Sequence, residues 1–299
     1  MLRGAVRRVS ALPNLLTLGN AWCGLLAIAK AIDAMVLSRS DASLFYPTFQ
    51  TACLLIFLGM LFDALDGKVA RLVGGSSEFG AQLDSFSDAL TFGCAPALLA
   101  KVLIEHEARE GVYSGNARLH FIAAAAFALM AILRLARFNL ETTTDESSHR
   151  DFKGLPSPAA AGALVSTLLL YLELVNPPPA SRIGDVGWFS ALIPHYTPSQ
   201  LGWMLPTIAS MMPLLGVLMV SRVRYTHAVS FLTRKGSFFL LVYLVFASFL
   251  LYAAPEPVLF VTFVGFALLG VIRTLFPRKP DPNATVPVED EIFVHGARD

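Results

Sequence analysis

Charged residues are scarce in this sequence. Lys, Arg, Asp and Glu make up 15% of the 299 residues, hydrophobic residues make up 55%, and the mean hydropathy is +0.60. Soluble globular domains carry about 25% charged residues, so the composition excludes an ordinary soluble domain. The formal net charge is +1. We expect no nucleic acid partner, because nucleic-acid-binding surfaces concentrate positive charge.

Cysteine is also scarce, with three residues in the whole chain. Cys23, Cys53 and Cys94 each lie inside an apolar stretch and lack the spacing of metal ligands, so we expect them to serve packing. The N-terminus carries arginines but no short apolar core followed by a small-residue cleavage site, and we expect no removable signal peptide. We also find no internal repeat, heptad pattern or second soluble domain.

Long apolar stretches, in contrast, recur along the chain. Eight can be delimited, and most have the length of about 20 residues that a helix needs to cross a bilayer. They predict an all-α, polytopic membrane protein with about eight transmembrane helices. The expected spans are roughly 12–37, 48–73, 79–104, 118–138, 157–176, 203–222, 237–254 and 257–276.

The distribution of Lys and Arg predicts the orientation of these spans. If the N-terminus is cytoplasmic, 17 of the 23 basic residues fall on the cytoplasmic side and six on the other. Because cytoplasmic loops are enriched in Lys and Arg, we expect both termini to be cytoplasmic. The predicted location is a bacterial-type inner or plasma membrane.

Four aspartates stand out against this apolar background. Asp63 and Asp66 are three residues apart, and Asp84 and Asp88 are four apart, so on helices each pair shares one face. If residues 74–77, Gly-Gly-Ser-Ser, separate two antiparallel helices, all four carboxylates converge. Converging carboxylates need cations between them, and hard oxygen ligands suit Mg²⁺, Mn²⁺ or Ca²⁺. A cap or surface role suits any single aspartate, but four acids at helical spacing in a membrane chain favour a two-metal site.

The depth of the aspartates predicts the kind of substrate. The second span begins near Pro47, and Asp63 would lie about 24 Å further along a helix. That distance places Asp63 just inside the boundary of a hydrocarbon core about 30 Å thick. We therefore expect the active site at the cytoplasmic end of the helix bundle, where the headgroup of a lipid substrate lies.

The aspartates belong to a longer pattern, D-x2-D-G-x2-A-R-x8-G-x3-D-x3-D, which the chain matches at all eight fixed positions. This pattern is the signature of the CDP-alcohol phosphotransferases, and the chain is identified as a member by this resemblance. The resemblance implies transfer of a phosphatidyl group from CDP-diacylglycerol with release of CMP, dependent on two divalent cations, Mg²⁺ or Mn²⁺. It implies that Asp88 is the general base, and that the metal ligands are Asp63, Asp66, Asp84 and Asp88.

The nucleotide would be bound by the first half of the signature. The resemblance assigns its contacts to Asp66, Gly67, Ala70 and Arg71. Gly67 and Gly80 lack side chains and would let a phosphate approach the backbone, although close helix packing explains the same glycines. Two polar residues of the first span, three apart, would reach the same compartment, with helix capping as the alternative: Asn14 and Thr17.

Two further stretches, Leu133 to Asn139 and Phe152 to Gly162, resemble the phosphatidylserine synthase branch, which carries R-x2-RFN and F-x-GLP-x-PAAA. With the opening Leu-Pro-Asn-Leu-Leu-Thr, the resemblance covers roughly residues 12 to 165. It implies L-serine as the acceptor. Serine has a carboxylate, and the expected acceptor contacts are Arg134, Arg137, Asn139 and Lys153.

Several alternatives stay open at this point. The two arginines of the fourth span also suit snorkelling anchors at the membrane boundary. Glycerol phosphate, inositol phosphate or choline could replace serine as the acceptor. A cation transporter is a more distant alternative, because its ion site would lie at the membrane midplane rather than at one edge.

The chain divides into four expected regions. An N-terminal interfacial segment, 1–11, precedes the catalytic helices, 12–176. Additional transmembrane helices, 177–276, are expected to serve as scaffold or as a homodimer surface, and a polar C-terminal tail, 277–299, follows them. The expected partners are CDP-diacylglycerol, L-serine and membrane lipid.

Overall fold

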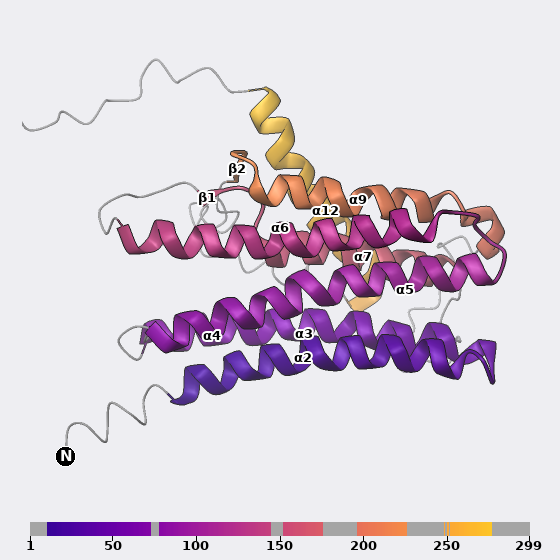
Figure 1. Ribbon diagram of the computed structural model, residues 1–299, viewed down its shortest axis with the longest axis horizontal. Coiled ribbons are helices and arrows are strands. Elements are labelled where there is room, and N and C mark those ends of the chain that lie inside the picture. The colour runs from indigo at the N-terminus through magenta and orange to yellow at the C-terminus, as the bar shows by residue number, and fades with distance from the viewer. Residues whose placement is uncertain are drawn as a thin grey trace, which may run out of the picture.

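The chain folds into a bundle of long helices (Figure 1). The structure is a computed structural model, and it describes residues 11–72, 78–144, 152–175, 196–225, 248, 250 and 252–276. The expected N-terminal segment and C-terminal tail therefore lie almost wholly outside the described residues. The α-helices are α2 (Ala11–Leu37), α3 (Phe45–Leu72), α4 (Glu78–Asp88), α5 (Ala95–Arg109), α6 (Ala117–Thr144), α7 (Ser157–Val175), α9 (Met204–Val220) and α12 (Pro255–Leu275).

The expected polytopic helical architecture is confirmed. Seven helical stretches in the described residues are long and apolar enough to cross a membrane. One of them, Glu78–Arg109, is continuous from α4 through a π-helical segment, Ala89–Cys94, into α5. The eighth expected span, 237–254, falls largely outside the described residues. The other six stretches are Ala11–Leu37, Ala42–Leu72, Ala117–Leu140, Ser157–Val175, Pro198–Val220 and Pro255–Leu275.

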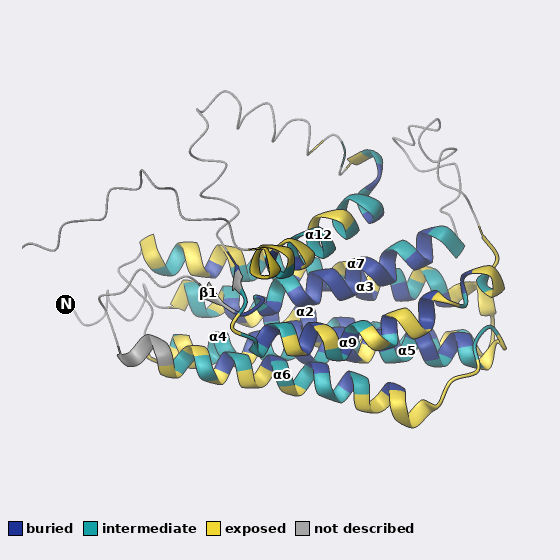
Figure 2. Cartoon of the chain, turned by 90° about the horizontal axis from the view of Figure 1, so that it is seen from above, coloured by how far each residue is buried: buried dark blue, intermediate teal, exposed yellow. Residues whose placement is uncertain are grey.

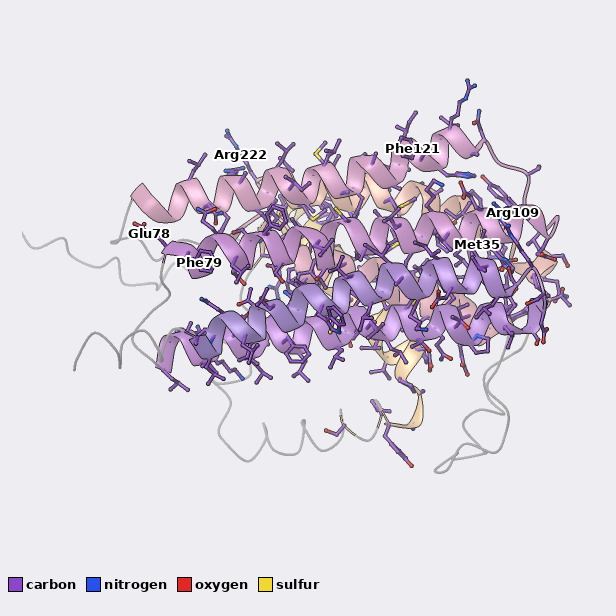
Figure 3. The ribbon with its side chains drawn as sticks, turned by 60° about the horizontal axis from the view of Figure 1, so that its bottom comes forward. Met35, Glu78, Phe79, Arg109, Phe121 and Arg222 are labelled. Carbon is purple, nitrogen blue, oxygen red and sulfur yellow. The ribbon has the colours of Figure 1, made fainter. Side chains whose placement is uncertain are left out.

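The bundle has two ends, and the aspartate signature lies at one of them. We call it the acidic end; α2 begins there, α3 ends there and α4 begins there. Glu78 and Phe79 lie at this end, whereas Met35 and Arg109 lie at the other (Figure 3). A short 3-10 turn, Ala42–Leu44, joins α2 to α3 at the far end. Its cap is Asp41, which accepts hydrogen bonds from the backbone nitrogen and the hydroxyl of Ser43 at 2.9 and 2.6 Å.

The core lies around α7. Most of this helix is buried (Figure 2), because the run Ala159 to Ala163 consists of small residues that let neighbouring helices approach. Gly162 is one such contact, since a Cβ there would collide with the ring of Phe263 in α12. The outward faces carry exposed Leu, Ile and Phe side chains, such as Leu61 and Phe121. Exposed apolar side chains of this kind suit a lipid environment.

One element of the fold was not expected. Two strands of two residues each, β1 (Phe152–Lys153) and β2 (Arg224–Tyr225), pair antiparallel. They lie toward the acidic end, next to the end of α9 (Figure 1). Sequence periodicity does not predict strands this short, because alternation needs at least four residues to become visible.

Candidate active site

Three aspartates gather where α3 ends and α4 begins. Asp63 and Asp66 lie in the last turns of α3, and Asp84 lies in α4. Carboxylate oxygens from all three lie within 4.8 Å of one another. Asp66 is buried, whereas Asp63 and Asp84 are half-buried. Because ligands on opposite sides of a divalent cation lie about 4–5 Å apart, these carboxylates have the spacing of one coordination shell.

The convergence follows from the helical spacing within each pair. The expected break at 74–77 lies outside the described residues, but the helices on either side of it end and begin at the same place. Asp63 and Asp66 are therefore presented on one face of α3. Asp84 and Asp88 share one face of α4 in the same way.

The surroundings of Asp66 suit a bound cation. Its Oδ2 atom is buried and accepts no hydrogen bond. The ion pairs formed within the described ranges join Lys30 to Asp33 and Lys101 to Glu105, and neither involves the aspartates of the signature. A buried carboxylate oxygen with neither a donor nor a counterion is unfavourable. A divalent cation would satisfy it, so the residues present fit a metal site.

Asp88 is held in a different way. It is the last residue of α4 and is buried, and its Oδ1 accepts a hydrogen bond of 3.1 Å from Nδ2 of Asn20. Its carboxylate lies within electrostatic range of the other three aspartates of the signature and of Arg134. Because the amide occupies only Oδ1, Oδ2 remains able to bind a cation or to accept a proton.

Helix α2 is fastened to the chain on both sides of Asp88. The Ser87 hydroxyl donates to the backbone carbonyl of Thr17 at 2.9 Å, and the Thr91 hydroxyl donates to that of Asn20 at 2.9 Å. Gly24 permits this contact, since a Cβ there would lie 2.5 Å from Oγ1 of Thr91. Thr91 belongs to the π-helical segment, a feature that is frequent at functional sites. The hydrogen bonds from Ser87 and Thr91 thus fix the position of α2, and with it Asn20, relative to Asp88.

The expected nucleotide contacts lie at the acidic end, around the aspartates. Thr17 is buried and lies beside Asp66, while its hydroxyl donates to the carbonyl of Pro13 at 3.0 Å. Arg71 is exposed, and its Nε donates to the carbonyl of Gly67 at 3.0 Å. A Cβ on Gly67 would meet no atom within 4 Å, so the space beside that glycine is open. The other expected contacts are half-buried there: Asn14, Ala70 and Gly80.

Three of the four expected acceptor contacts have side chains that the structure describes. Arg134 is half-buried, and its Nη1 donates to the hydroxyl of Ser157 at 2.9 Å. Its Nε is buried and has no hydrogen-bond partner. Asn139 reaches α4, where its Nδ2 donates to the hydroxyl of Ser85 at 2.9 Å. Arg137 is half-buried on the same helix as Arg134. The backbone of Lys153 belongs to β1, and its side chain lies outside the described part of the chain.

The sequence analysis missed Asn20, Ser85 and Thr91. A signal for Asn20 was present, because Asn14, Thr17 and Asn20 recur every three residues in an otherwise apolar span. That spacing predicts one polar stripe along a helix. No comparable signal marks Thr91, because an isolated threonine in an apolar span usually bonds to its own helix.

Comparisons with known proteins identify the family of this chain. The model of the CDP-alcohol phosphatidyltransferase family matches residues 10–193. A CDP-diacylglycerol–serine O-phosphatidyltransferase of Helicobacter pylori (strain ATCC 700392 / 26695) is 29% identical over 264 residues, which cover 88% of this chain and 91% of that protein. A protein of the same name from Bacillus subtilis (strain 168) is 36% identical over 163 residues, 54% of this chain and 76% of that protein. An archaetidylserine synthase of Methanothermobacter thermautotrophicus is 36% identical over 171 residues, 55% and 61% of the two chains.

Proposed function

The chain belongs to the CDP-alcohol phosphatidyltransferase family, and we propose that it transfers the phosphatidyl group of CDP-diacylglycerol to the hydroxyl of L-serine, giving phosphatidylserine and CMP. One observation carries the proposal. Three carboxylates lie within 4.8 Å of one another, and a fourth, Asp88, is held beside them by a separate donor. The names of the relatives from Helicobacter pylori and Bacillus subtilis support serine as the acceptor.

The aspartates would hold the metal and the nucleotide. Asp63, Asp66 and Asp84 would bind divalent cations, and Asp88 would complete the set through Oδ2. When bound, two such ions, Mg²⁺ or Mn²⁺, would neutralise the pyrophosphate and stabilise the charge on departing CMP. The open space beside Gly67 leaves room for a phosphate group. The remaining contacts to the CDP group would come from Asn14, Thr17, Asp66, Ala70, Arg71 and Gly80.

Asp88 would act as the general base. The serine hydroxyl oxygen attacks the phosphorus that carries the diacylglycerol, and its proton passes to Asp88. The bond from that phosphorus to the bridging oxygen breaks, and the electron pair leaves with CMP. The hydrogen bond from Asn20 to Oδ1 would hold the Asp88 carboxylate in one orientation for this transfer.

Serine would be oriented by its carboxylate. Arg134 fits this role because its guanidinium lies within electrostatic range of Asp88 and keeps a buried Nε without a partner. An unpaired buried N–H group favours an incoming anionic acceptor. Arg137, Asn139 and Lys153 would complete the acceptor side.

The membrane setting follows from the helices and the basic residues. Seven apolar helices suggest an integral membrane protein. We propose that the acidic end and both termini are cytoplasmic, since most Lys and Arg residues fall on that side. In this arrangement residues 12–176 form the catalytic helices, and residues 177–276 add further helices, with a homodimer as a remaining prediction.

A reconstituted assay tests the proposal. Purified protein with CDP-diacylglycerol and a panel of labelled alcohols should release CMP with serine, stop when the metal is chelated, and recover with Mg²⁺ or Mn²⁺. Asp63→Asn and Asp84→Asn should be nearly inactive and should bind Mn²⁺ weakly by electron paramagnetic resonance. Asp33→Asn is the matched control, because Asp33 pairs with Lys30 near the far end of α2. Turnover of glycerol phosphate instead of serine would overturn the acceptor, and full activity in chelator would overturn the metal site.

A further inference from the structure

A short segment after α9 runs beside the chain that leads into α7. We call residues 221–225 the strap. In β1 and β2, Phe152 pairs with Tyr225 and Lys153 pairs with Arg224. The contact continues beyond the strands, since the Gly154 nitrogen donates to the carbonyl of Val223 at 2.8 Å. Residues 152–154 therefore form a backbone ladder with the strap.

Gly154 is the residue that permits this contact. Its φ is +89°, a conformation that other L-residues rarely adopt. A Cβ at this position would also collide with the carbonyl oxygen of Met219 at the end of α9. The next nitrogen, of Leu155, donates to the carbonyl of Leu218 at 3.0 Å. The backbone between β1 and α7 thus packs directly against the last turn of α9, and no side chain would fit at position 154.

Tyr225 anchors the strap to α12. The residue is buried, and its hydroxyl donates to the carbonyl of Ala267 at 3.3 Å. A Cβ on Gly270 would collide with the Tyr225 ring, so the ring lies directly on that turn of α12. The Phe266 ring lies 5.4 Å away, centroid to centroid. Helix α12 therefore holds the strap, and the strap holds the entry to α7.

This entry leads directly to the acceptor side of the site. Ser157, fully buried at the start of α7, follows Gly154 by three residues and accepts the hydrogen bond from Arg134. Arg134 in turn lies within electrostatic range of Asp88. The strap lies at the acidic end, where Arg222 appears on the same side as Glu78 (Figure 3). A continuous series of contacts thus runs from α12 through the strap to Arg134.

We propose that the strap positions the acceptor-binding side of the active site, and that Gly154 and Tyr225 are positioning residues for the acceptor carboxylate. The inference rests on the proposed function for the identity of the acceptor. It gives α9 and α12, which lie beyond the residues that the family model matches, a role other than scaffold. Displacing the strap should move Ser157 and release Arg134, while the aspartates on α3 and α4 stay in place.

The test compares kinetic constants for the two substrates in the full-length protein. Tyr225→Phe removes one neutral hydrogen bond and should raise the KM for serine about 2- to 10-fold. Gly154→Ala forces both an unfavourable φ and a collision, and should raise it by about tenfold or more. The KM for CDP-diacylglycerol should change by less than about twofold in both variants. A loss of positioning separates the two constants in this way, whereas general destabilisation lowers the active fraction and leaves both unchanged.

Gly111→Ala is the matched control. Gly111 also has a positive φ, of +78°, but it lies at the far end and a Cβ there meets nothing within 4 Å. It carries the same backbone strain without touching the strap, so its serine KM should equal that of the wild type. An unchanged serine KM in both Gly154→Ala and Tyr225→Phe would overturn the proposal. Should Gly154→Ala fail to fold, Tyr225→Phe alone decides.

A second readout does not depend on turnover. Phenylglyoxal modifies arginine side chains, and mass spectrometry can follow its reaction at Arg134. Release from Ser157 should speed this reaction at least about twofold in Gly154→Ala and Tyr225→Phe, and leave it unchanged in Gly111→Ala. If the wild type ignores serine, the proposed function fails, and the rate at Arg134 still decides whether the strap positions that residue. Wild-type rates in both strap variants would refute it.

Discussion

Asp88 and Asn20 make the contact that most directly links the bundle to the proposed chemistry. Asp88→Asn removes the base, and loss of a general base lowers rates by about 10²–10⁴-fold. Asn20→Ala removes only the donor to Asp88 Oδ1, and hydrogen bonds to charged groups contribute about 1.5–3 kcal/mol, or roughly 10- to 150-fold. We therefore expect kcat to fall in both variants, more in Asp88→Asn, measured by CMP release at saturating substrates.

Asn116→Ala provides the comparison for Asn20→Ala. The Asn116 side chain also makes one hydrogen bond, but it accepts from the backbone nitrogen of Arg118 at 3.0 Å, on an exposed turn at the far end. This variant should keep the wild-type kcat. If Asn20→Ala keeps it as well, Asn20 only fills space beside Asp88 and does not orient its carboxylate.

The surroundings of Arg134 favour a contact with the acceptor over a role as a membrane anchor. An anchoring arginine keeps its guanidinium in water, whereas here Nη1 donates to buried Ser157 and Nε is buried. Loss of a charge-assisted contact costs about 1.5–3 kcal/mol, so Arg134→Ala should raise the KM for serine by roughly 10- to 150-fold. The KM for CDP-diacylglycerol should stay nearly constant. Equal increases in both constants, measured in initial-rate assays, would contradict a carboxylate contact.

At the scale of whole elements, the packing of α2 and α3 against the π-helical segment sets the shape of the site. A Cβ on Gly59 of α3 would lie 2.7 Å from Cγ2 of Thr91 and 3.1 Å from Oδ1 of Asn20. Overpacking of a tight contact costs about 1–3 kcal/mol. Gly59→Ala should therefore lower both thermal stability in detergent and the rate of CMP release, because α3 moves away from the π-helical segment.

A second substitution tests this cause. Thr91→Ser removes Cγ2 but keeps the hydroxyl that donates to the carbonyl of Asn20. The double variant Gly59→Ala, Thr91→Ser should recover much of the lost stability, which a double-mutant cycle measures as a coupling energy. Gly265→Ala in α12 is the control, since nothing lies within 4 Å of its Cβ. Additive losses in the double variant would show that the two residues do not share this contact.

The sequence predicted those features of the fold that depend on local patterns of residues. The long helices follow from the length of the apolar stretches, and seven of the eight expected spans are found among the described residues. The convergence of Asp63, Asp66 and Asp84 follows from helical spacing. The contact from Asn20 to Asp88 joins positions 68 residues apart, and the hydrogen bond from Tyr225 to Ala267 joins positions 42 apart. No local pattern encodes such contacts, because they depend on how whole helices pack. The strap was missed for the same reason.

The whole molecule is polarised along the bundle. The acidic end holds the aspartates of the signature, Arg134 and the strap, whereas the described residues of the far end hold other buried polar groups, among them Glu107, whose Oε2 has no hydrogen-bond partner. There Tyr46 donates to Oε1 of Glu107 at 2.9 Å, and the His106 ring stacks on Phe45. A substrate whose headgroup stays at the membrane surface can reach only one of these ends. The orientation of the bundle therefore decides which compartment must supply serine.

Cysteine labelling in intact cells measures this orientation. In a cysteine-free background, Glu78→Cys and Arg222→Cys introduce thiols at the acidic end, and Ser40→Cys and Ser114→Cys introduce them at the far end; all four positions are exposed. An impermeant maleimide should modify only the far-end pair, because the basic residues favour a cytoplasmic acidic end. Permeabilised cells should show all four modified, which confirms that each thiol is reachable. Modification of Glu78→Cys alone from outside would place the aspartates on the wrong side for cytoplasmic serine. Modification of both Glu78→Cys and Ser114→Cys from outside would show that the third span, Glu78–Arg109, does not cross the membrane.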